Sequence, residues 1–281
     1  MGDLRKGEPD TVYLSRHRAA AGPRWALEGR YLPEDFALTR LAEIPSAEAR
    51  GLLEGLETGE AAQDPLLAPV EPYQEVWASG VTYERSREAR EHESADADAY
   101  ARVYGAERPE LFFKAHGWRA VGHGGSVRVR RDSRWNVPEP ELVLVLNSRM
   151  EILGFTAGND ISSRDIEGEN PLYLPQAKVY DGACSLGPGI VLAGPDAMRD
   201  LPVRVRISRE NEAVFDGEIS TARMKRSFEE LAGYLGRELT LPSGAFLMTG
   251  TGIVPGDEFT LTPGDRVEVS VGGLMLENGV A

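Results

Sequence analysis

The sequence holds little of what several common kinds of site require. Only one of its 281 residues, Cys184, is a cysteine, and only four are histidines. That composition excludes an intrachain disulfide and a zinc site built from cysteine and histidine. Residues 1–10 carry charges without the apolar segment of a secretory signal, and no run approaches the roughly 18 apolar residues of a membrane span. We therefore expect a cytoplasmic protein with no membrane partner, in which any metal ion is held by oxygen ligands.

Positive charge is also in short supply. Lysine and arginine number 31 against 45 aspartate and glutamate residues, which gives a formal net charge of −14 at pH 7. Binding to the phosphate backbone of a nucleic acid depends on clustered lysine and arginine side chains, and binding to an anionic membrane surface does so too. The sequence therefore predicts no nucleic-acid partner.

What the chain does contain begins with a small N-terminal unit. Apolar alternation at Val12–Leu14 indicates a strand, and Ser46 is placed to cap a helix with three leucines on one face. Residues 64–72 include three prolines, which favour a joint between domains over the interior of an element. We predict a small N-terminal domain at residues 1–70 and a second domain at residues 71–281.

The second domain is rich in strand patterns and poor in helices. Residues Glu84–Arg108 are charge-rich, which fits a solvated helix or a mobile flap, and only Ser227–Leu239 has the apolar spacing of a further helix. The sequence thus favours an α+β, β-rich fold. Its predicted strands are Leu111–Ala115, Ser126–Arg130, Glu141–Leu146, Ile190–Ala193, Val203–Ile207, Phe259–Leu261 and Val267–Val271.

Three carboxylates are predicted to meet at the open end of one hairpin. Glu139 and Glu141 point to the same face because a strand alternates faces with a period of two. With a turn centred directly after residue 148, position 139 lies opposite position 158, and Asp160 falls on the same face. A bulge, or a loop one residue longer or shorter, would move Asp160 to the other face. Like charges this close require a divalent cation or a raised pKa.

Several motifs, in the same order along the chain, resemble the fumarylacetoacetate hydrolase superfamily over about residues 72–281. The resemblance implies a fumarylacetoacetate hydrolase-like mixed β-sandwich/β-roll catalytic domain with a small N-terminal domain. It also implies a homodimer or a dimer-based homotetramer, for which the residue patterns give no independent support. The motifs are Gly158-Asn159-Asp160-Ile161-Ser162-Ser163-Arg164-Asp165, Gln176-Ala177-Lys178 with Asp181-Gly182, Gly187-Pro188-Gly189 and Thr249-Gly250-Thr251-Gly252.

The same resemblance implies which residues form the site. Glu139, Glu141 and Asp160 would hold the metal ion, for which Mg²⁺, Mn²⁺ or Ca²⁺ suits three carboxylates with positions left open to water or substrate. Beyond the metal ligands, the resemblance implies places in the site for Arg164, Lys178 and the loop that contains Gly250 and Thr251.

One departure from the hydrolases of this family concerns the segment Gly80–Ser86. Those hydrolases usually carry Gly-x-Asn-Tyr-x-x-His followed by a glutamate, which activate the water that cleaves a carbon–carbon bond. Here Ser86 stands at the histidine position, and His92 and Glu93 would reach the site only through a remodelled flap. The segments Gly80–Tyr83, Pro109–Lys114 and Glu167–Lys178 resemble a narrower branch, the 2-keto-3-deoxy-pentonate dehydratases.

The chemistry of such a dehydratase follows from its substrate. A 2-oxo acid chelates a hard cation through a carboxylate oxygen and the keto oxygen, and the cation stabilises the enolate that forms when C3 loses a proton. A hydroxyl group then leaves C4 as water, and the product is 2,5-dioxopentanoate. This elimination needs a base and an acid but no activated water, so loss of the histidine fits a lyase.

Two residues are candidates for the proton transfers. We favour Lys178 first, with a structural role as ion-pair partner of the metal-site carboxylates as the equal alternative. Glu110 is second, and an ion pair at a strand end is its simpler interpretation.

Four further residues are candidates for binding substrate. Arg164 has a fork suited to a carboxylate, or it is a partner of Asp160 or Asp165. Thr251 and Gly250 offer backbone N–H groups to an anion, or form a plain turn. Ser86 either contacts substrate or begins a helix.

Three hypotheses for the whole protein remain open. The first is a metal-dependent dehydratase of a 2-keto-3-deoxy sugar acid. The second is a metal-dependent hydrolase of an acylpyruvate or a fumarylacetoacetate-like diketone, and the third is a non-catalytic binding protein. In the first two, the small-molecule substrate is an anion that meets a protein of charge −14, so attraction must be local, from the metal ion with Arg164 and Lys178.

Overall fold

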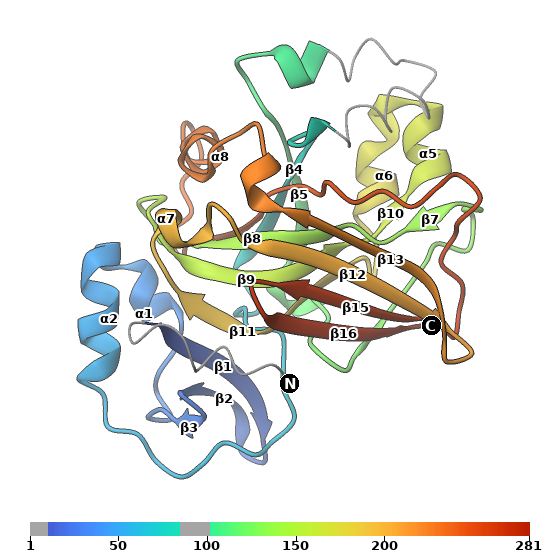
Figure 1. Cartoon of the computed structure of the whole chain (residues 1–281). Helices are drawn as coiled ribbons and strands as arrows, with labels where there is room; N and C mark the ends of the chain where they lie inside the picture. Colours follow the sequence, from blue (N-terminus) through green and yellow to red (C-terminus); the bar gives the residue numbers. More distant parts are fainter. Residues whose placement is uncertain (1–10, 85–101) are drawn as a thin grey trace.

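The computed structural model describes residues 11–84 and 102–281, and Figure 1 shows two large sheets layered over one another. The larger sheet has nine strands in the order β3-β2-β1-β11-β9-β8-β14-β4-β5, antiparallel except for the parallel pair of β14 with β4. In chain order the strands are β1 (Val12–Ala19), β2 (Gly22–Leu27), β3 (Arg30–Tyr31), β4 (Glu75–Gly80), β5 (Glu110–His116), β8 (Pro140–Leu146), β9 (Ile152–Asp160), β11 (Cys184–Leu192) and β14 (Ala245–Met248).

The second sheet has five strands in the order β13-β12-β15-β16-β6. Alternation explains its position: Val203, Val205 and Ile207 of β12 are buried, while Arg204 and Arg206 between them are exposed. Its buried face and the face of β8 that carries Leu142 and Leu144 share one apolar core. The strands are β6 (Ser126–Val127), β12 (Pro202–Arg209), β13 (Glu212–Ser220), β15 (Arg266–Val271) and β16 (Leu274–Val280).

The helices are short, and the fold is rich in strands, as the sequence predicted. Among the described residues the longest is α2, with nine residues, and no helix is long and apolar enough to cross a membrane. The helical segments are α1 (Thr39–Ala42), α2 (Ser46–Glu54), η2 (Gly117–Arg119), α5 (Arg164–Glu169), η3 (Pro171–Tyr173), α6 (Leu174–Lys178), α7 (Pro195–Met198), η4 (Thr221–Arg223) and α8 (Phe228–Leu235), and a two-stranded sheet pairs β7 (Asn136–Val137) with β10 (Ser162–Ser163).

The N-terminal unit is joined to the large sheet. Strand β1 pairs with β11, with Val12 opposite Leu192, so the first three strands extend the sheet that carries the later ones. Leu14 and Leu53 share a second apolar core with Val143, on the opposite face of β8 from the first core. The domain boundary at residue 70 stays a prediction, because strand pairing does not test whether residues 1–70 fold as a unit.

Two predicted elements differ from the structure in their details. Ser46 is the first residue of α2 and not its cap, because the carboxylate of Glu151 accepts from the Ser46 N–H at 2.7 Å in place of a capping side chain. Helix α8 starts as predicted, with the Ser227 hydroxyl accepting from the Glu230 N–H at 3.1 Å, but it ends at Leu235 and not at residue 239, with Gly236 as its C-cap.

One predicted strand is wrong. Phe259–Leu261 has no strand pairing. Turns flank this short apolar run on both sides, at residues 257–258 and 263–264, so only a few residues remain to pair. The other predicted strands are present, although β6 covers only the first two residues of its predicted range. Segment Glu84–Arg108 lies largely in residues 85–101, outside the described residues.

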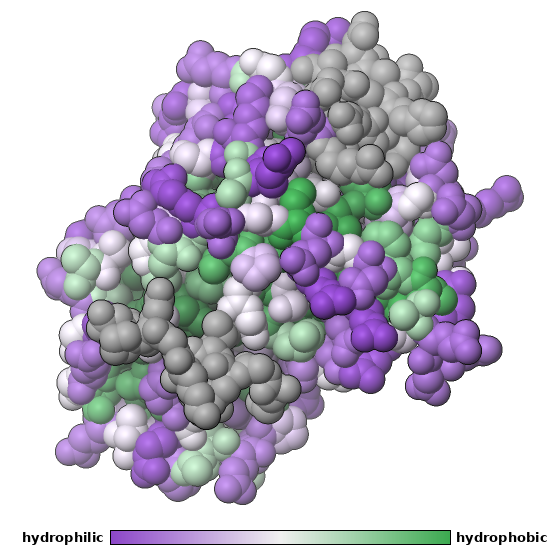
Figure 2. Space-filling view, viewed as in Figure 1, coloured by the Kyte–Doolittle hydropathy of each residue, from purple (hydrophilic) through white to green (hydrophobic). Residues whose placement is uncertain are grey.

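On the face shown in Figure 2, most of the coloured surface is hydrophilic, in keeping with a sequence in which 27% of the residues are charged. Hydrophobic side chains are visible mainly toward the middle of this face.

Candidate active site

The hairpin of β8 and β9 carries the three carboxylates, in a register two residues away from the predicted one. Glu141 lies opposite Gly158, and the Asp160 N–H donates to the Glu139 carbonyl at 2.9 Å. Glu139 therefore faces Asp160 itself, where the sequence had predicted position 158. The three acidic residues still share one face, because a shift of two residues preserves the alternation of a strand.

Two separate departures produce this shift. The turn is one residue longer than predicted, so that Leu146 pairs with Ile152, and a bulge follows between Val145 and Leu146. Either departure alone would have turned Asp160 away from Glu139. Together they shift the register by two residues, so Asp160 stays on the same face as Glu139.

The result is a compact, buried set of oxygen ligands. Glu139, Glu141 and Asp160 are all buried, and each offers a carboxylate oxygen within 4.8 Å of the others' oxygens. A set of three carboxylates without nitrogen or sulfur is the donor chemistry of a hard divalent cation such as Mg²⁺, Mn²⁺ or Ca²⁺.

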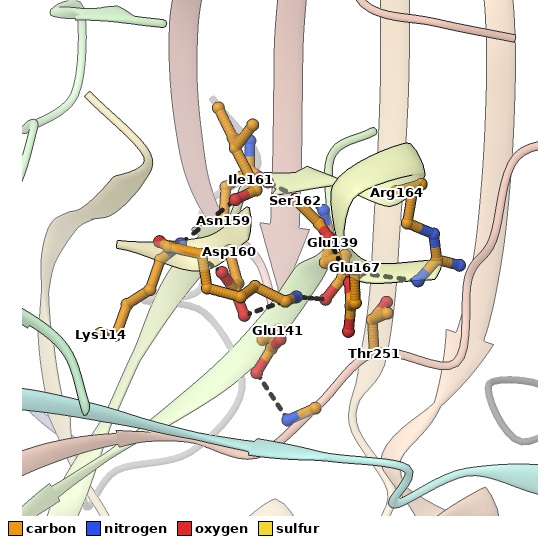
Figure 3. Close-up of polar contacts among 12 residues, drawn as sticks. Lys114, Glu139, Glu141, Asn159, Asp160, Ile161, Ser162, Arg164, Glu167 and Thr251 are labelled. Atoms are coloured by element: carbon orange, nitrogen blue, oxygen red, sulfur yellow. Dashed lines mark hydrogen bonds and ion pairs between the residues drawn. The ribbon is translucent and has the colours of Figure 1, made fainter. Parts of the chain in front are cut away.

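Two buried lysines and one arginine contact these carboxylates, and Figure 3 labels Lys114 and Arg164 among them. The Lys178 ammonium lies 2.6 Å from Oε2 of Glu139 and 3.0 Å from Oδ2 of Asp160. The Lys114 ammonium lies 2.5 Å from Oδ1 of Asp160, and Nη1 of Arg164 lies 3.3 Å from Oε1 of Glu139. Each of Glu139 and Asp160 is thus held from two sides.

Glu141 has a different environment. Burial raises its pKa well above the usual value, and the neighbouring charges of Asp160 and Glu139 raise it further. The Gly250 N–H donates to Oε2 of Glu141 at 2.5 Å and favours the ionised form, but this contribution is the smaller one. A cation bound at this predicted ligand would offset the cost of its buried charge.

A cavity opens over the cluster and collects most of the predicted site residues. Glu110, Arg164, Lys178 and Thr251 line it together with Glu139 and Asp160. The remaining lining residues are Ser79, Gly80, Val81, Phe112, Glu167 and Val254. Candidate ligands, candidate proton-transfer groups and candidate substrate-binding groups therefore face one space.

The position of Glu110 depends on a glycine in the neighbouring strand. Gly80 of β4 pairs with Glu110 of β5, and a Cβ atom built on Gly80 would lie 2.0 Å from Oε2 of Glu110. Only glycine leaves room for the Glu110 carboxylate to lie across this backbone.

Two of the predicted contacts with substrate take on other partners. The Gly250 N–H is directed at Glu141, so in this structure the residue orients a predicted metal ligand. Thr251 lines the cavity while its hydroxyl bonds with the backbone of Ile253 at 3.2–3.3 Å. Their direct contact with substrate stays a prediction. Ser86, His92 and Glu93 lie outside the described residues.

Lys114 and Glu167 were not proposed as site residues from the sequence. Lys114 follows Glu110 and Phe112 at alternate positions, and that periodicity was the available signal for a shared face. Glu167 follows Arg164 by three residues, a spacing that places both on one side of a helix. Helix α5 has no apolar stripe in its six residues, so nothing in the sequence predicted that helix.

The charges of the site also fit one divalent cation. The described side chains of the site include five carboxylates, from Glu110, Glu167 and the three candidate ligands. They also include three cationic groups, from Lys114, Lys178 and Arg164. The formal excess of two negative charges among these described side chains is what one divalent cation offsets.

Comparison with known proteins decides the family. Residues 75–281 match the fumarylacetoacetate (FAA) hydrolase C-terminal family. The chain belongs to the fumarylacetoacetate hydrolase family. The match begins at the first residue of β4 and runs to the last residue of the chain. It therefore contains strands β5 and β8, which carry or adjoin residues that line the cavity.

Two curated relatives of this family resemble the chain over most of its length. A probable 2-keto-3-deoxyxylonate dehydratase of Haloferax volcanii is 50% identical over 211 residues, which cover 74% of this chain and 72% of the relative. A 2-dehydro-3-deoxy-D-arabinonate dehydratase of Saccharolobus solfataricus is 45% identical over 213 residues, which cover 73% of this chain and 70% of the relative.

A solved structure extends this similarity to nearly the whole chain. The structure of a 2-keto-3-deoxy-D-arabinonate dehydratase in complex with magnesium and 2,5-dioxopentanoate has a TM-score of 0.73 and 35% sequence identity, and the alignment covers 96% of this chain and 98% of that one. Because the alignment extends well beyond residues 75–281, the N-terminal strands also resemble those of that structure.

Proposed function

We propose that this protein is a divalent-metal-dependent hydro-lyase that converts 2-keto-3-deoxy-pentonate into 2,5-dioxopentanoate and water. The observation that carries the proposal is the buried Glu139, Glu141 and Asp160 cluster, which opens into a cavity lined by Lys178 and Glu110. The two dehydratases that are 45–50% identical to the chain support the reaction, and the magnesium in the related complex supports Mg²⁺ as the metal.

The proposed metal would be held by Glu139, Glu141 and Asp160. When bound, it would supply Lewis-acid chemistry, engaging the carboxylate and keto oxygens of a 2-oxo acid and offsetting the negative charge that develops on the keto oxygen. The protein's own part is to hold the three ligands in place, through Lys178 on Glu139 and Asp160, Lys114 on Asp160 and the Gly250 N–H on Glu141.

The atoms of the reaction balance without any other reactant. One proton leaves C3 and the hydroxyl group leaves C4, which together form water and a double bond between C3 and C4. One hydrogen from C5 and one from its hydroxyl group then move as protons to C3 and C4. C5 thereby becomes the aldehyde of 2,5-dioxopentanoate, and no external oxidant is required.

The cavity offers two groups for these transfers. Lys178 lies beside Glu139 and Asp160, which places it next to the keto end of a substrate held at those ligands, and we assign it the proton at C3. Glu110 also lines the cavity, and we assign it the departing hydroxyl at C4. Arg164, paired with Glu139, is proposed to bind the substrate carboxylate, for which its fork is suited.

A single assay tests the function. Purified protein with Mg²⁺ and 2-keto-3-deoxy-pentonate should form 2,5-dioxopentanoate, whereas an acylpyruvate in a parallel reaction should yield no pyruvate. Pyruvate without dehydration would show that the protein is a hydrolase. If neither product forms, the hypothesis of a non-catalytic binding protein would be favoured.

Lys178→Gln should lower kcat by about 10²–10⁴-fold if Lys178 transfers a proton. A loss confined to Mg²⁺ affinity would instead make Lys178 an ion-pair partner only.

We also propose a cytoplasmic location and a homodimer or dimer-based homotetramer. The buried free thiol of Cys184 fits a reducing compartment. Light scattering coupled to gel filtration would measure the assembly, and a monomeric mass at micromolar concentration would contradict it.

A further inference from the structure

The cavity contains two carboxylates that the predicted metal ligands do not use. Glu110 enters from β5, and Glu167 enters from α5. Figure 3 shows the Glu167 side chain directed from α5 toward the cluster of carboxylates. Both residues line the same space as Glu139 and Asp160, so a substrate held at the cluster shares that space with two further carboxylates.

Glu167 is held rigidly in this position. It is 3% exposed, and the Ser162 hydroxyl donates to its Oε2 at 2.8 Å. Ser162 follows the candidate ligand Asp160 by two residues, so one short stretch of backbone fixes both carboxylates relative to each other. Burial keeps this carboxylate beside the cavity, and the hydrogen bond from Ser162 orients it.

The cations that line the cavity are already engaged by carboxylates. Among the described lining residues these are Lys178, which is paired with Glu139 and Asp160, and Arg164, which is paired with Glu139. A substrate with one carboxylate needs only the metal ion and Arg164. A second carboxylate on the substrate would enter the cavity that Glu110 and Glu167 also line, where like charges in a partly desolvated space repel.

Hydroxyl groups on the substrate would meet the same walls with the opposite result. A carboxylate accepts hydrogen bonds from hydroxyl donors, and such charge-assisted bonds are stronger than neutral ones. The carboxylates of Glu110 and Glu167 therefore distinguish two classes of 2-oxo acid by the group at the far end of the substrate.

We infer that Glu167 is a specificity determinant that selects 2-oxo acids with a hydroxylated tail and rejects those with a second, distal carboxylate. This inference deepens the proposed function, on which it rests for the orientation of the 2-oxo acid. It names the class of substrate that the cavity excludes, the 2-oxo dicarboxylates, together with the residue that excludes them.

The test measures binding, which does not depend on turnover. Three five-carbon compounds that differ only in the distal group are titrated in a calorimeter with saturating Mg²⁺: 5-hydroxy-2-oxopentanoate, 2-oxopentanoate and 2-oxoglutarate. For the natural protein we expect the hydroxyl compound to bind best and 2-oxoglutarate worst. In Glu167→Gln, the affinity for 2-oxoglutarate relative to 2-oxopentanoate should rise at least about tenfold, because a nearby negative charge is gone while the side-chain shape remains.

Glu169→Gln is the matched control. Glu169 lies on the same helix, two residues further on, and is exposed outside the cavity, so its substitution changes the net charge equally. Its affinity ratio should stay within about twofold of the natural protein, since exposed charges are screened by salt. Equal effects of both substitutions would show a general charge effect and overturn the inference. An unchanged ratio in Glu167→Gln would overturn it as well.

A second variant covers a failure of Glu167→Gln to fold, which its circular dichroism and its Mg²⁺-dependent melting temperature would reveal. Ser162→Ala removes one hydrogen bond but leaves Glu167 charged and buried beside the cavity, so this variant should still bind 2-oxoglutarate worst of the three compounds. Equal affinities for the three in Ser162→Ala would contradict the inference.

The outcome is separable from the proposed function. If the protein discriminates the three compounds through Glu167 but forms no 2,5-dioxopentanoate, the inference is supported and the dehydratase function is contradicted. If the protein is a dehydratase but binds 2-oxoglutarate as tightly as the hydroxyl compound, the function is supported and the inference is contradicted.

Discussion

The ammonium of Lys114 lies 2.5 Å from Oδ1 of Asp160 and 2.5 Å from the carbonyl oxygen of Lys178. One buried side chain of β5 thus connects a candidate metal ligand at the end of β9 with the end of α6, from which the candidate base projects. A third bond, to the carbonyl of Ile161 at 3.2 Å, ties it to the residue after Asp160. Lys114 therefore sets the distance between the metal site and Lys178.

Lys114→Met should destabilise the protein strongly. It removes a fully buried cation and leaves the charge of Asp160 with less compensation, for which about 3–5 kcal/mol is typical. Urea denaturation of the protein without metal measures the change. Arg40→Met, at an exposed position of α1, is the control and should change the free energy of unfolding by less than about 0.5 kcal/mol. A cost as small as the control's would show that Lys114 is not needed to hold Asp160.

Glu141→Gln should act in opposite directions on two measurements. Without metal, the variant should melt at the same or a higher temperature than the natural protein, because the substitution removes a buried charge whose pKa is raised by burial and by Asp160 and Glu139. With Mg²⁺, the natural protein should gain stability and the variant should gain little, because a ligand is lost. Thermal melts with and without Mg²⁺ measure both effects, with Glu169→Gln as the charge-matched control. An undiminished response of Glu141→Gln to Mg²⁺ would exclude Glu141 as a ligand.

The ion pair of Arg209 with Asp265 should make stability depend on pH in the acid range. Burial alone would raise the pKa of Asp265, but hydrogen bonds from Arg209 at 2.7 and 2.9 Å, and from Thr262, outweigh it and lower the pKa below its usual value. The pair therefore stabilises the fold fully above the pKa of the unfolded carboxyl, about 3.9, and this contribution is lost as the pH falls through the lower folded pKa.

Asp265→Asn tests that dependence. The variant should lose about 2 kcal/mol of stability at pH 7 and show a smaller fall in stability between about pH 5 and pH 2 than the natural protein. Urea titrations across that range measure both. Asp216→Asn, in an exposed pair with Arg204, is the control and should have less effect at neutral pH. Parallel pH profiles for Asp265→Asn and the natural protein would rule out this role of the pair.

Gly80→Ala should impair the proposed reaction without removing metal binding. The new methyl group would lie 2.0 Å from Oε2 of Glu110, so the carboxylate must move, while Glu139, Glu141 and Asp160 keep their contacts. We expect kcat to fall at least about tenfold, with the Mg²⁺-dependent rise in melting temperature retained. Gly51→Ala, where a Cβ meets nothing within 4 Å, is the control and should leave kcat unchanged. Full activity in Gly80→Ala would remove Glu110 from the mechanism.

The hairpin of β8 and β9 shows how much of the candidate site could be predicted from the sequence. Alternation in β8 placed Glu139 and Glu141 on one face, and that property depends only on the local backbone. Their alignment with Asp160 was also predicted, but through a register that the structure corrects by two residues. A longer turn and a bulge are each decided by packing on both faces of the sheet, and nothing local to the hairpin reveals that they cancel.

The sequence by itself determined the kind of chemistry this protein can perform. One cysteine and four histidines, beside an excess of carboxylates, leave oxygen as the ligand for a metal ion, and the strand alternation brings two of those ligands together. Only the tertiary structure decided what surrounds them. Lys114 reaches Asp160 from β5 and Glu167 enters from α5, because burial in a shared cavity joins residues whose separation along the chain carries no signal.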